Sequence, residues 1–247
     1  MSASPFDAVV FAGGGNRCMW QAGFWTAAAE PIGLSPRVVA GVSAGATVAS
    51  TLLAGVSDRA LSHFKEATAR NARNVYPLNA LRRRPMFPHE GMYRTAILSV
   101  MDSAAFSRLQ SAPELRILMT RIPRWLGPRS GVLVGWGAYE FEKRLGNPVH
   151  PRFARRLGFR PEVARAQSCE TPGELADLLL HSSCTPPFTP VFRRHGAPVL
   201  DGGLIDNVPV TALEDADGDP PERTLVLLTR RYPGGRWPEG GGRTYVQ

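Results

Sequence analysis

A serine flanked by glycines is the first group in this chain that could do chemistry. The pentapeptide G-V-S-A-G, from Gly41 to Gly45, lies between the apolar run Arg37–Ala40 and the run of small and apolar residues Ala44–Ala54. In a G-x-S-x-G turn the serine hydroxyl is exposed between a strand and a helix, and the glycines allow close backbone approach. Ser43 is therefore a candidate nucleophile for acyl transfer. The alternative is a helix N-cap, and the pentapeptide alone does not separate the two interpretations.

A glycine-rich loop precedes this serine in the chain. Backbone N–H groups in such a loop can point together at a developing oxyanion, with a helix N-terminus behind them. The loop is no P-loop, because Lys-Ser/Thr is missing at the required offset, and no dinucleotide fingerprint, because Cys18 takes the third glycine position. A purely structural turn is the alternative. The candidate oxyanion residues are Gly13, Gly14, Gly15, Asn16 and Arg17.

Asp201 is the acidic residue best placed to act as a base. It ends a short apolar segment and is followed by Gly202 and Gly203. A carboxylate that hydrogen-bonds a serine hydroxyl can take its proton directly as attack proceeds. An Asp of ordinary pKa, about 3.9, is a poor base for an alcohol, so partial desolvation and oxyanion stabilisation would have to compensate. A turn-forming Asp-Gly pair is the alternative.

A histidine-based triad is the weaker proposal. The α/β-hydrolase order is Ser, acid, His with several strands before the serine, whereas only about two strand-like runs precede Ser43. The chain has five histidines: His181 and His195 come before Asp201, and His63, His89 and His150 have polar neighbours.

The cysteines give no sign of a metal site or a disulfide framework. Cys18, Cys169 and Cys184 have no metal-ligand spacing, and their number is odd. We expect buried free thiols, no metal and no cofactor.

The elements that must position these groups alternate between strand and helix. Two strand-loop-helix units in succession, Asp7–Ala12 with Cys18–Ala29 and Arg37–Ala40 with Ala44–Ala54, predict a parallel sheet. The stretch around Trp125 to Tyr139 is either a mobile flap over an acyl-binding cleft or a core helix, Val132–Leu145, and we favour the helix. Further predicted elements are helices at 58–71, 91–101 and 172–181 and strands at 115–120, 197–201 and 223–229.

Composition indicates one globular domain. The chain has 247 residues, of which 43% are hydrophobic and 20% charged, enough for a substantial core. The N-terminus has no signal-peptide pattern, and the uncharged run Val38–Ser57 is interrupted by glycines, so we expect no membrane span and a cytoplasmic protein.

The positive charge is almost wholly arginine. The net charge is +8, and no nucleic-acid-binding signature accompanies it, so no nucleic acid is expected as a partner. A solvated surface is the first interpretation, and peripheral contact of a basic face with anionic phospholipid is the second. The arginines cluster at 82–84, at 152 with 155 and 156, at 193–194 and at 230–231.

Taken together, the motifs resemble those of the patatin-like phospholipase family. The segments G-G-G-N-R, G-V-S-A-G, S-S-C-T-P-P-F-T-P and D-G-G-L-I-D-N-V-P-V occur in the family's order between Val10 and Val210. The resemblance implies an α/β fold, a three-layer α/β/α arrangement with a mainly parallel central sheet. One departure is Cys18, where the family loop usually has glycine.

The resemblance also implies a site. It assigns a catalytic dyad to Ser43 and Asp201, supported by Gly41, Gly45, Gly202 and Gly203. It places an oxyanion hole at the backbone of Gly13, Gly14 and Gly15, with Arg17 helping to hold the loop. The implied activity is calcium-independent hydrolysis of acyl esters.

The predicted function is therefore a lipid acyl hydrolase of the phospholipase A or lysophospholipase type, acting on phospholipid or another acyl ester through an acyl-enzyme. Residues 1–247 would form a single acyl hydrolase domain, and the end at Gln247 suggests C-terminal truncation. Two alternatives are a soluble carboxylesterase or thioesterase with the same dyad, and a non-catalytic module that binds lipid or anions.

Overall fold

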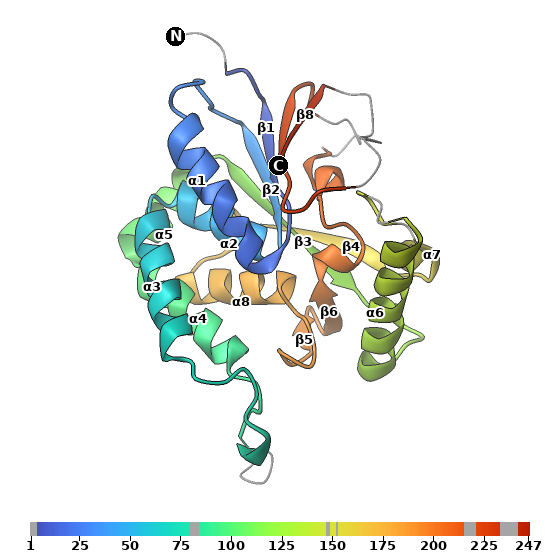
Figure 1. The fold of residues 1–247 in the computed structure, drawn as a ribbon. Coiled ribbons are helices and arrows are strands. Elements are labelled where there is room, and N and C mark those ends of the chain that lie inside the picture. The colour runs from blue at the N-terminus through green and yellow to red at the C-terminus, as the bar shows by residue number, and fades with distance from the viewer. Residues whose placement is uncertain (1–3, 80–83, 147–148, 152, 215–220, 233–241) are drawn as a thin grey trace.

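The computed structural model describes residues 4–79, 84–146, 149–151, 153–214, 221–232 and 242–247. Within these residues an eight-stranded sheet forms the centre of the molecule (Figure 1). Its strands are β1 (Ala8–Phe11), β2 (Val38–Val42), β3 (Glu114–Arg121), β4 (Arg160–Arg165), β5 (Phe192–Arg194), β6 (Ala197–Asp201), β7 (Thr224–Leu227) and β8 (Arg243–Val246).

The sheet is mixed but mostly parallel. Strands β8, β7, β1, β2 and β3 pair in parallel with one another in that order. Strands β4 and β6 both pair with β3 in antiparallel fashion, and β5 pairs with β6. The predicted mainly parallel sheet is confirmed.

Strand β3 organises the part of the sheet that holds the candidate site. Strand β4 pairs with β3 from Arg116 to Arg121, so it occupies one edge of β3 along that length. Strands β2 and β6 must therefore share the other edge, one after the other along β3. Strand β2 pairs with β3 up to Val42, which lies opposite Leu118, and β6 pairs with the next part of β3, where Asp201 lies opposite Met119. The ends of β2 and β6 thus meet at consecutive residues of one edge.

Helices cover both faces of the sheet unequally. The helices are α1 (Met19–Ala28), α2 (Ala44–Leu53), α3 (Ser57–Arg70), α4 (His89–Val100), α5 (Ser103–Ser111), α6 (Pro128–Leu145), α7 (Phe153–Arg156) and α8 (Pro172–Ser182). The larger apolar cluster joins the sheet to α1, α2, α4, α5 and α8. Two smaller clusters join it to the short helix Val210–Leu213 and to α6 and α7. The arrangement agrees with the three-layer expectation.

The residues of strand β1 alternate between the two faces of the sheet. Val9 and Phe11 pack in the larger cluster, whereas Ala8 and Val10 pack in a smaller one on the opposite face. Alternate residues of a strand point to opposite faces, so a strand covered on both sides must be apolar throughout. All four residues of β1 are buried.

Helix α6 differs from the sequence-based expectation. It begins at Pro128 rather than Val132, because proline is well tolerated in the first turn of a helix. The prediction of a core helix was wrong in its packing: only Gly131, Gly135 and Ala138 of α6 are buried. Val132 and Val134 pack partly buried against the cluster on this face, whereas Leu133, Trp136, Phe141 and Leu145 are exposed.

Five further elements, α5, α7, β4, β5 and β8, were not predicted. Strand β4 has the sequence R-P-E-V-A-R, which lacks the apolar pattern of a central strand. Among the described strands it pairs only with β3. Strand β8 follows a glycine-rich stretch of which residues 233–241 lie outside the described part of the chain, as do Arg82, Arg83 and Arg152 of the arginine groups.

The remaining expectations concern cysteines and membrane spans. The three cysteines are buried free thiols, as predicted. Burial raises the pKa of Cys18 to about 12 and the pKa values of Cys169 and Cys184 to about 11. Among the described residues, no helix has the length and apolar character needed to cross a bilayer.

Candidate active site

Ser43 occupies the sharp turn between β2 and α2. Its backbone φ is 54°, in the left-handed region that residues with side chains rarely adopt. Its N–H donates to Oγ of Ser182 at 2.8 Å, and that hydroxyl donates to the carbonyl oxygen of Leu118 on β3 at 2.7 Å. A strained residue persists only where its surroundings hold it in place. Here Ser182, at the end of α8, holds the turn against β3.

Gly45 allows the first turn of α2 to lie directly on the end of β1. A Cβ atom at this position would stand 2.5 Å from the carbonyl oxygen of Ala12 and 2.6 Å from that of Phe11. Both neighbours are backbone atoms, which cannot move aside as a flexible side chain could. The glycine spacing around Ser43 is therefore explained by close packing of backbone.

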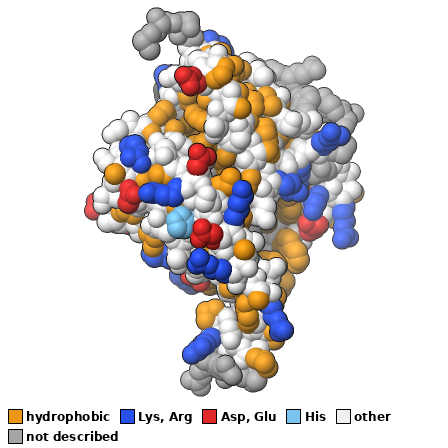
Figure 2. All heavy atoms as spheres, turned by 60° about the vertical axis from the view of Figure 1, so that its left-hand side comes forward, with side chains coloured by type: hydrophobic (Ala, Val, Ile, Leu, Met, Phe, Trp, Pro, Cys, Tyr) orange, Lys and Arg blue, Asp and Glu red, His pale blue; other side chains and the backbone are white. Residues whose placement is uncertain are grey.

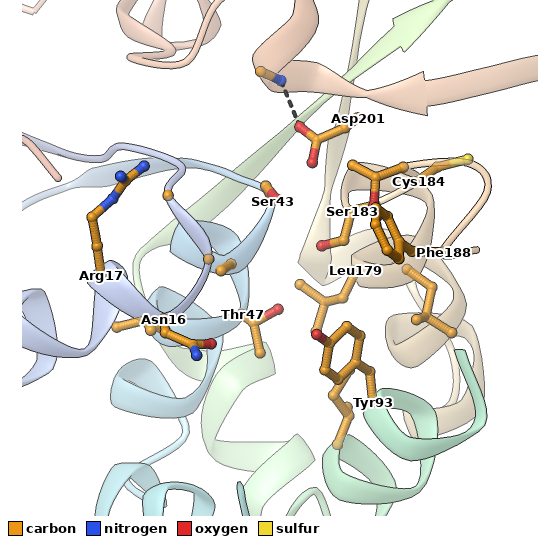
Figure 3. Close-up of a pocket in the computed structure, with 18 of the residues that line it drawn as sticks. Asn16, Arg17, Ser43, Thr47, Tyr93, Leu179, Ser183, Cys184, Phe188 and Asp201 are labelled. Atoms are coloured by element: carbon orange, nitrogen blue, oxygen red, sulfur yellow. Dashed lines mark hydrogen bonds between the residues drawn. The ribbon is translucent and has the colours of Figure 1, made fainter. Parts of the chain in front are cut away.

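Asp201 is held at the end of β6 by three hydrogen bonds. Its N–H donates to the carbonyl oxygen of Cys184 at 2.8 Å, and its own carbonyl oxygen accepts from Oγ1 of Thr120 at 2.8 Å. Its carboxylate accepts from the N–H of Gly203 at 2.7 Å, the dashed line in Figure 3. The residue is only 8% exposed.

The surroundings of Asp201 make it a stronger base than an ordinary aspartate. Burial raises the pKa of its carboxyl to about 6, although the nearby Ser43 hydroxyl and the Gly203 amide lower it. Desolvation disfavours the charged form of a carboxyl group, which is why its proton affinity increases. The compensation expected from the sequence, partial desolvation, is present.

Ser43 and Asp201 lie beside each other in the same cavity. Figure 3 shows the carboxylate of Asp201 directed toward the side chain of Ser43. Both residues belong to the cavity lining. Their proximity follows from β3, since Val42 and Asp201 pair with its consecutive residues Leu118 and Met119.

The glycine-rich loop is tied to the segment that follows Asp201. The N–H of Gly13 donates to the carbonyl oxygen of Asn207 at 2.9 Å, and Nδ2 of Asn207 donates back to the carbonyl oxygen of Gly13 at 2.9 Å. Oγ1 of Thr229 also donates to this oxygen. The N–H of Gly13 is therefore already engaged, and Gly13 is absent from the cavity lining.

The rest of this loop lies at the cavity. Gly14, Gly15, Asn16 and Arg17 all line it, and Gly15 has a φ of 59°, which favours glycine. In Figure 3 the Arg17 side chain lies to one side of Ser43, and its guanidinium is not directed at the serine. The hydrogen bonds that hold the loop come from Asn207 and Thr229 rather than from the Arg17 side chain.

The cavity has a volume of about 550 Å³ and is mostly apolar. Among the described residues that line it, Arg17 and Asp201 are the charged ones. One part lies between α2, α3 and α4, where Val48, Leu61, Phe64, Tyr93, Ala96 and Ile97 form the wall. Pockets of this size hold organic ligands, with polar groups fixing their orientation.

The histidines lie elsewhere. All five are within the described residues, and none lines the cavity. His181 packs its ring on Phe192 at 5.4 Å between centroids, and burial lowers its pKa. Nδ1 of His150 lies 2.9 Å from Oδ1 of Asp206. The structure therefore brings no histidine to Ser43.

Sequence reasoning missed several residues that position the site. Ser182 and Asn207 belong to quoted motif segments, but they were given no role because their partners are distant in the chain. Thr229 is the last residue of the final predicted strand, 223–229, where a polar residue after an apolar run is a usable signal. The cavity-lining residues Trp136 and Tyr139 were assigned to a core helix.

Comparison with known proteins places the chain in a family. No curated protein matches it. A solved structure, that of VipD from Legionella pneumophila, is similar over 92% of this chain and 50% of its own, with 14% identity and a TM-score of 0.44. The chain thus spans about half the length of VipD. The family model described as patatin-like phospholipase matches residues 9–214, which is most of the chain and includes Ser43 and Asp201. The chain therefore belongs to the patatin-like phospholipase family.

Proposed function

We propose that this protein is a serine-dependent lipid acyl hydrolase in which Ser43 is the nucleophile and Asp201 its base. The observation that carries the proposal is the strained Ser43 beside a buried carboxylate whose pKa is raised to about 6. Membership of a phospholipase family supports hydrolysis of lipid acyl esters. The mostly apolar cavity that reaches both residues supports an acyl substrate.

In the proposed reaction Oγ of Ser43 attacks the ester carbonyl carbon, and the hydroxyl proton passes to Asp201. The resulting oxyanion is held by backbone N–H groups. The tetrahedral intermediate then collapses, and Asp201 returns its proton to the leaving alcohol. Water attacks the acyl-enzyme, again giving a proton to Asp201, and this proton returns to Ser43 as the fatty acid leaves.

The proposed oxyanion donors are the amides of Gly14 and Gly15. Gly13 was included in the sequence-based set, but its N–H donates to Asn207. Its contribution is therefore to anchor the loop in place. Preorganised donors of this kind contribute about 3 kcal/mol each to transition-state stabilisation.

The substrate class follows from the cavity. The part enclosed by α2, α3 and α4 would hold an acyl chain, since each methylene buried there contributes about 0.8 kcal/mol. Arg17 is the lining cation among the described residues, so it would attract the phosphate group of a lipid to the side of the cavity formed by the glycine-rich loop. These features favour a long-chain phospholipid or lysophospholipid over a short soluble ester.

Replacement of Ser43 or Asp201 tests the dyad. We expect Ser43→Ala to abolish ester hydrolysis and labelling by a fluorophosphonate, because the attacking oxygen is lost. Asp201→Asn should lower both at least about a thousandfold, because the amide cannot accept the proton. Labelling is read by peptide mass spectrometry. Ser183→Ala, a serine lining the same cavity, is the matched control and should remain reactive. Turnover by Ser43→Ala would exclude the assignment.

The pH profile tests the base. Asp201 acts only as a carboxylate, so kcat/KM should rise with pH up to the pKa of about 6 and level off above it. The measurement is hydrolysis of a soluble ester across this range. An aspartate of ordinary pKa would place the rise in kcat/KM near pH 3.8, and that result would contradict the proposal that burial raises the pKa of Asp201.

Stability should change with pH in a defined direction. The folded pKa of Asp201 is above 3.8, so the native state binds more protons between pH 3.8 and about 6, and the free energy of unfolding falls as pH rises through this window. At neutral pH Asp201→Asn should therefore be more stable than the wild type, on the order of 2 kcal/mol. Urea unfolding measures the difference, which should shrink toward pH 3.8.

Asp102→Asn is the control for this measurement, because the pKa of Asp102 is shifted in the opposite direction to that of Asp201. The amide of Ala105 and the guanidinium of Arg59 lower the pKa of Asp102, so its charge is favourable in the folded protein. This variant should gain no stability at neutral pH. A gain of the same size in both variants would point to a general effect of removing negative charge.

The acyl-chain pocket can be tested by filling it. Ala96 on α4 lines the cavity, and Ala96→Trp should shorten the preferred chain length because the indole takes volume that methylenes would occupy. Thr95→Trp is the matched control, since Thr95 is exposed on the same helix. A series of p-nitrophenyl esters gives kcat/KM for each chain length. An unchanged preference in Ala96→Trp would remove this part of the cavity from the substrate site.

A further inference from the structure

Helix α6 and the segment leading into it expose large apolar side chains. Trp125 and Leu133 are each 70% exposed and Trp136 is 60% exposed. Arg129, Leu133 and Trp136 follow the spacing i, i+4, i+7, so they form one stripe along the helix. Exposed apolar side chains that cluster in this way mark a surface that meets a partner.

This stripe is continuous with the wall of the cavity. Trp136 is exposed and also lines the cavity, together with Val132 and Tyr139 of the same helix. Phe188, after α8, likewise lines the cavity and is 48% exposed. These two aromatic residues therefore belong to the rim of the cavity.

Residues 72–79 and 84–88 form a projecting segment that is attached to the same rim. We call this segment the arm. Phe87 of the arm contacts Phe188, with 5.4 Å between ring centroids. Leu78 is 71% exposed and Met86 is 41% exposed. Figure 1 shows the arm and α6 in the lower half of the molecule, and Figure 2 shows hydrophobic and basic side chains on the projecting arm.

The charged residues of the arm, and of the chain from Trp125 to Tyr139 that carries the stripe, are all positive. The sequence has no Asp or Glu between Glu66 and Glu90, or between Glu114 and Glu140, although both stretches contain arginines. In the described structure Arg73 and Arg84 of the arm, Arg129 of α6 and Arg124 just before α6 form no ion pair. By contrast, Arg59 and Arg70 on α3 are paired with carboxylates.

The combination of exposed apolar side chains and unpaired arginines indicates which kind of partner this surface would bind. A second copy of the chain would bring arginine against arginine, and like charges at an interface are unfavourable. An anionic bilayer accepts all the features at once: tryptophan favours the interface, leucine enters the acyl region, and arginine remains at the headgroups. The apolar rim would then open directly onto the acyl chains.

We propose that the cavity rim docks on an anionic lipid membrane through a face formed by Trp125, Arg129, Leu133 and Trp136 together with the exposed arm residues Leu78, Arg84 and Met86. The choice of a membrane as partner rests on the proposed function, because a lipid hydrolase must reach a substrate in a bilayer. Docking in this orientation lets an acyl chain pass from the bilayer into the cavity without crossing water. The methylenes of the chain are then not exposed to water, which would be unfavourable in free energy.

Co-sedimentation with vesicles tests the docking face. The protein carries Ser43→Ala, so that lipid is not consumed, and is mixed with vesicles of phosphatidylcholine alone or with added phosphatidylglycerol. Binding should be stronger with phosphatidylglycerol. Leu133→Gln should weaken it about tenfold and Arg129→Gln about fivefold. Leu145→Gln is the matched control, because Leu145 is 72% exposed on the same helix but lies outside the stripe.

Two outcomes would overturn the proposal, one in the vesicle assay and one in size-exclusion chromatography. Equal binding by Leu133→Gln and Leu145→Gln would overturn the proposal. So would a wild-type dimer in size-exclusion chromatography that Leu133→Gln converts to a monomer, because the face would then be an interface between copies.

Activity separates failure of docking from failure of the proposed function. With Ser43 intact, Leu133→Gln should hydrolyse a soluble short-chain ester at the wild-type rate but vesicle lipid more slowly, since Leu133 does not line the cavity. Hydrolysis of both substrates with no stripe-dependent binding would reject the docking face alone. Stripe-dependent binding without any hydrolysis would reject the proposed function alone.

Discussion

The geometry of the candidate site depends on one edge of strand β3. Strand β2 runs along this edge until Val42 lies opposite Leu118, and β6 meets it from the other direction with Asp201 opposite Met119. Two segments that are far apart in sequence therefore end at neighbouring residues of a single strand. Ser182 reinforces this junction, because its hydroxyl contacts both Leu118 and the amide of Ser43. Backbone pairing, rather than side-chain packing, determines where serine and carboxylate meet.

The glycine-rich loop and the turn after Asp201 form a second junction. The two hydrogen bonds between Gly13 and Asn207 join the first and last parts of the matched family region. The proposed oxyanion donors and the proposed base are therefore positioned by the same short segment. Burial of Asp201 makes it more basic but also costs stability at neutral pH, which is a common property of functional carboxylates.

Much of the fold could be predicted because the central strands are buried on both faces. Strands β1, β2 and β7 are short apolar runs between glycine-rich or polar segments, and each was recognised. Strand β4 was missed, since it alternates charged and apolar residues with proline and resembles a loop. Helix α6 was recognised but placed in the core, because sequence alone does not distinguish apolar residues that line a cavity from those that fill one.

The cysteines around the site limit its chemistry to oxygen. Cys184 lines the cavity beside the proposed dyad, and Cys18 lies directly behind the glycine-rich loop. Burial keeps both thiols protonated far above neutral pH, and each sulfur donates to a backbone carbonyl oxygen. A protonated thiol is a poor nucleophile, so in the proposed reaction an acyl group on Ser43 would have no competing thiolate at these two cysteines. The intermediate would therefore remain an oxygen ester until water arrives, even though a thiol lies in the same cavity.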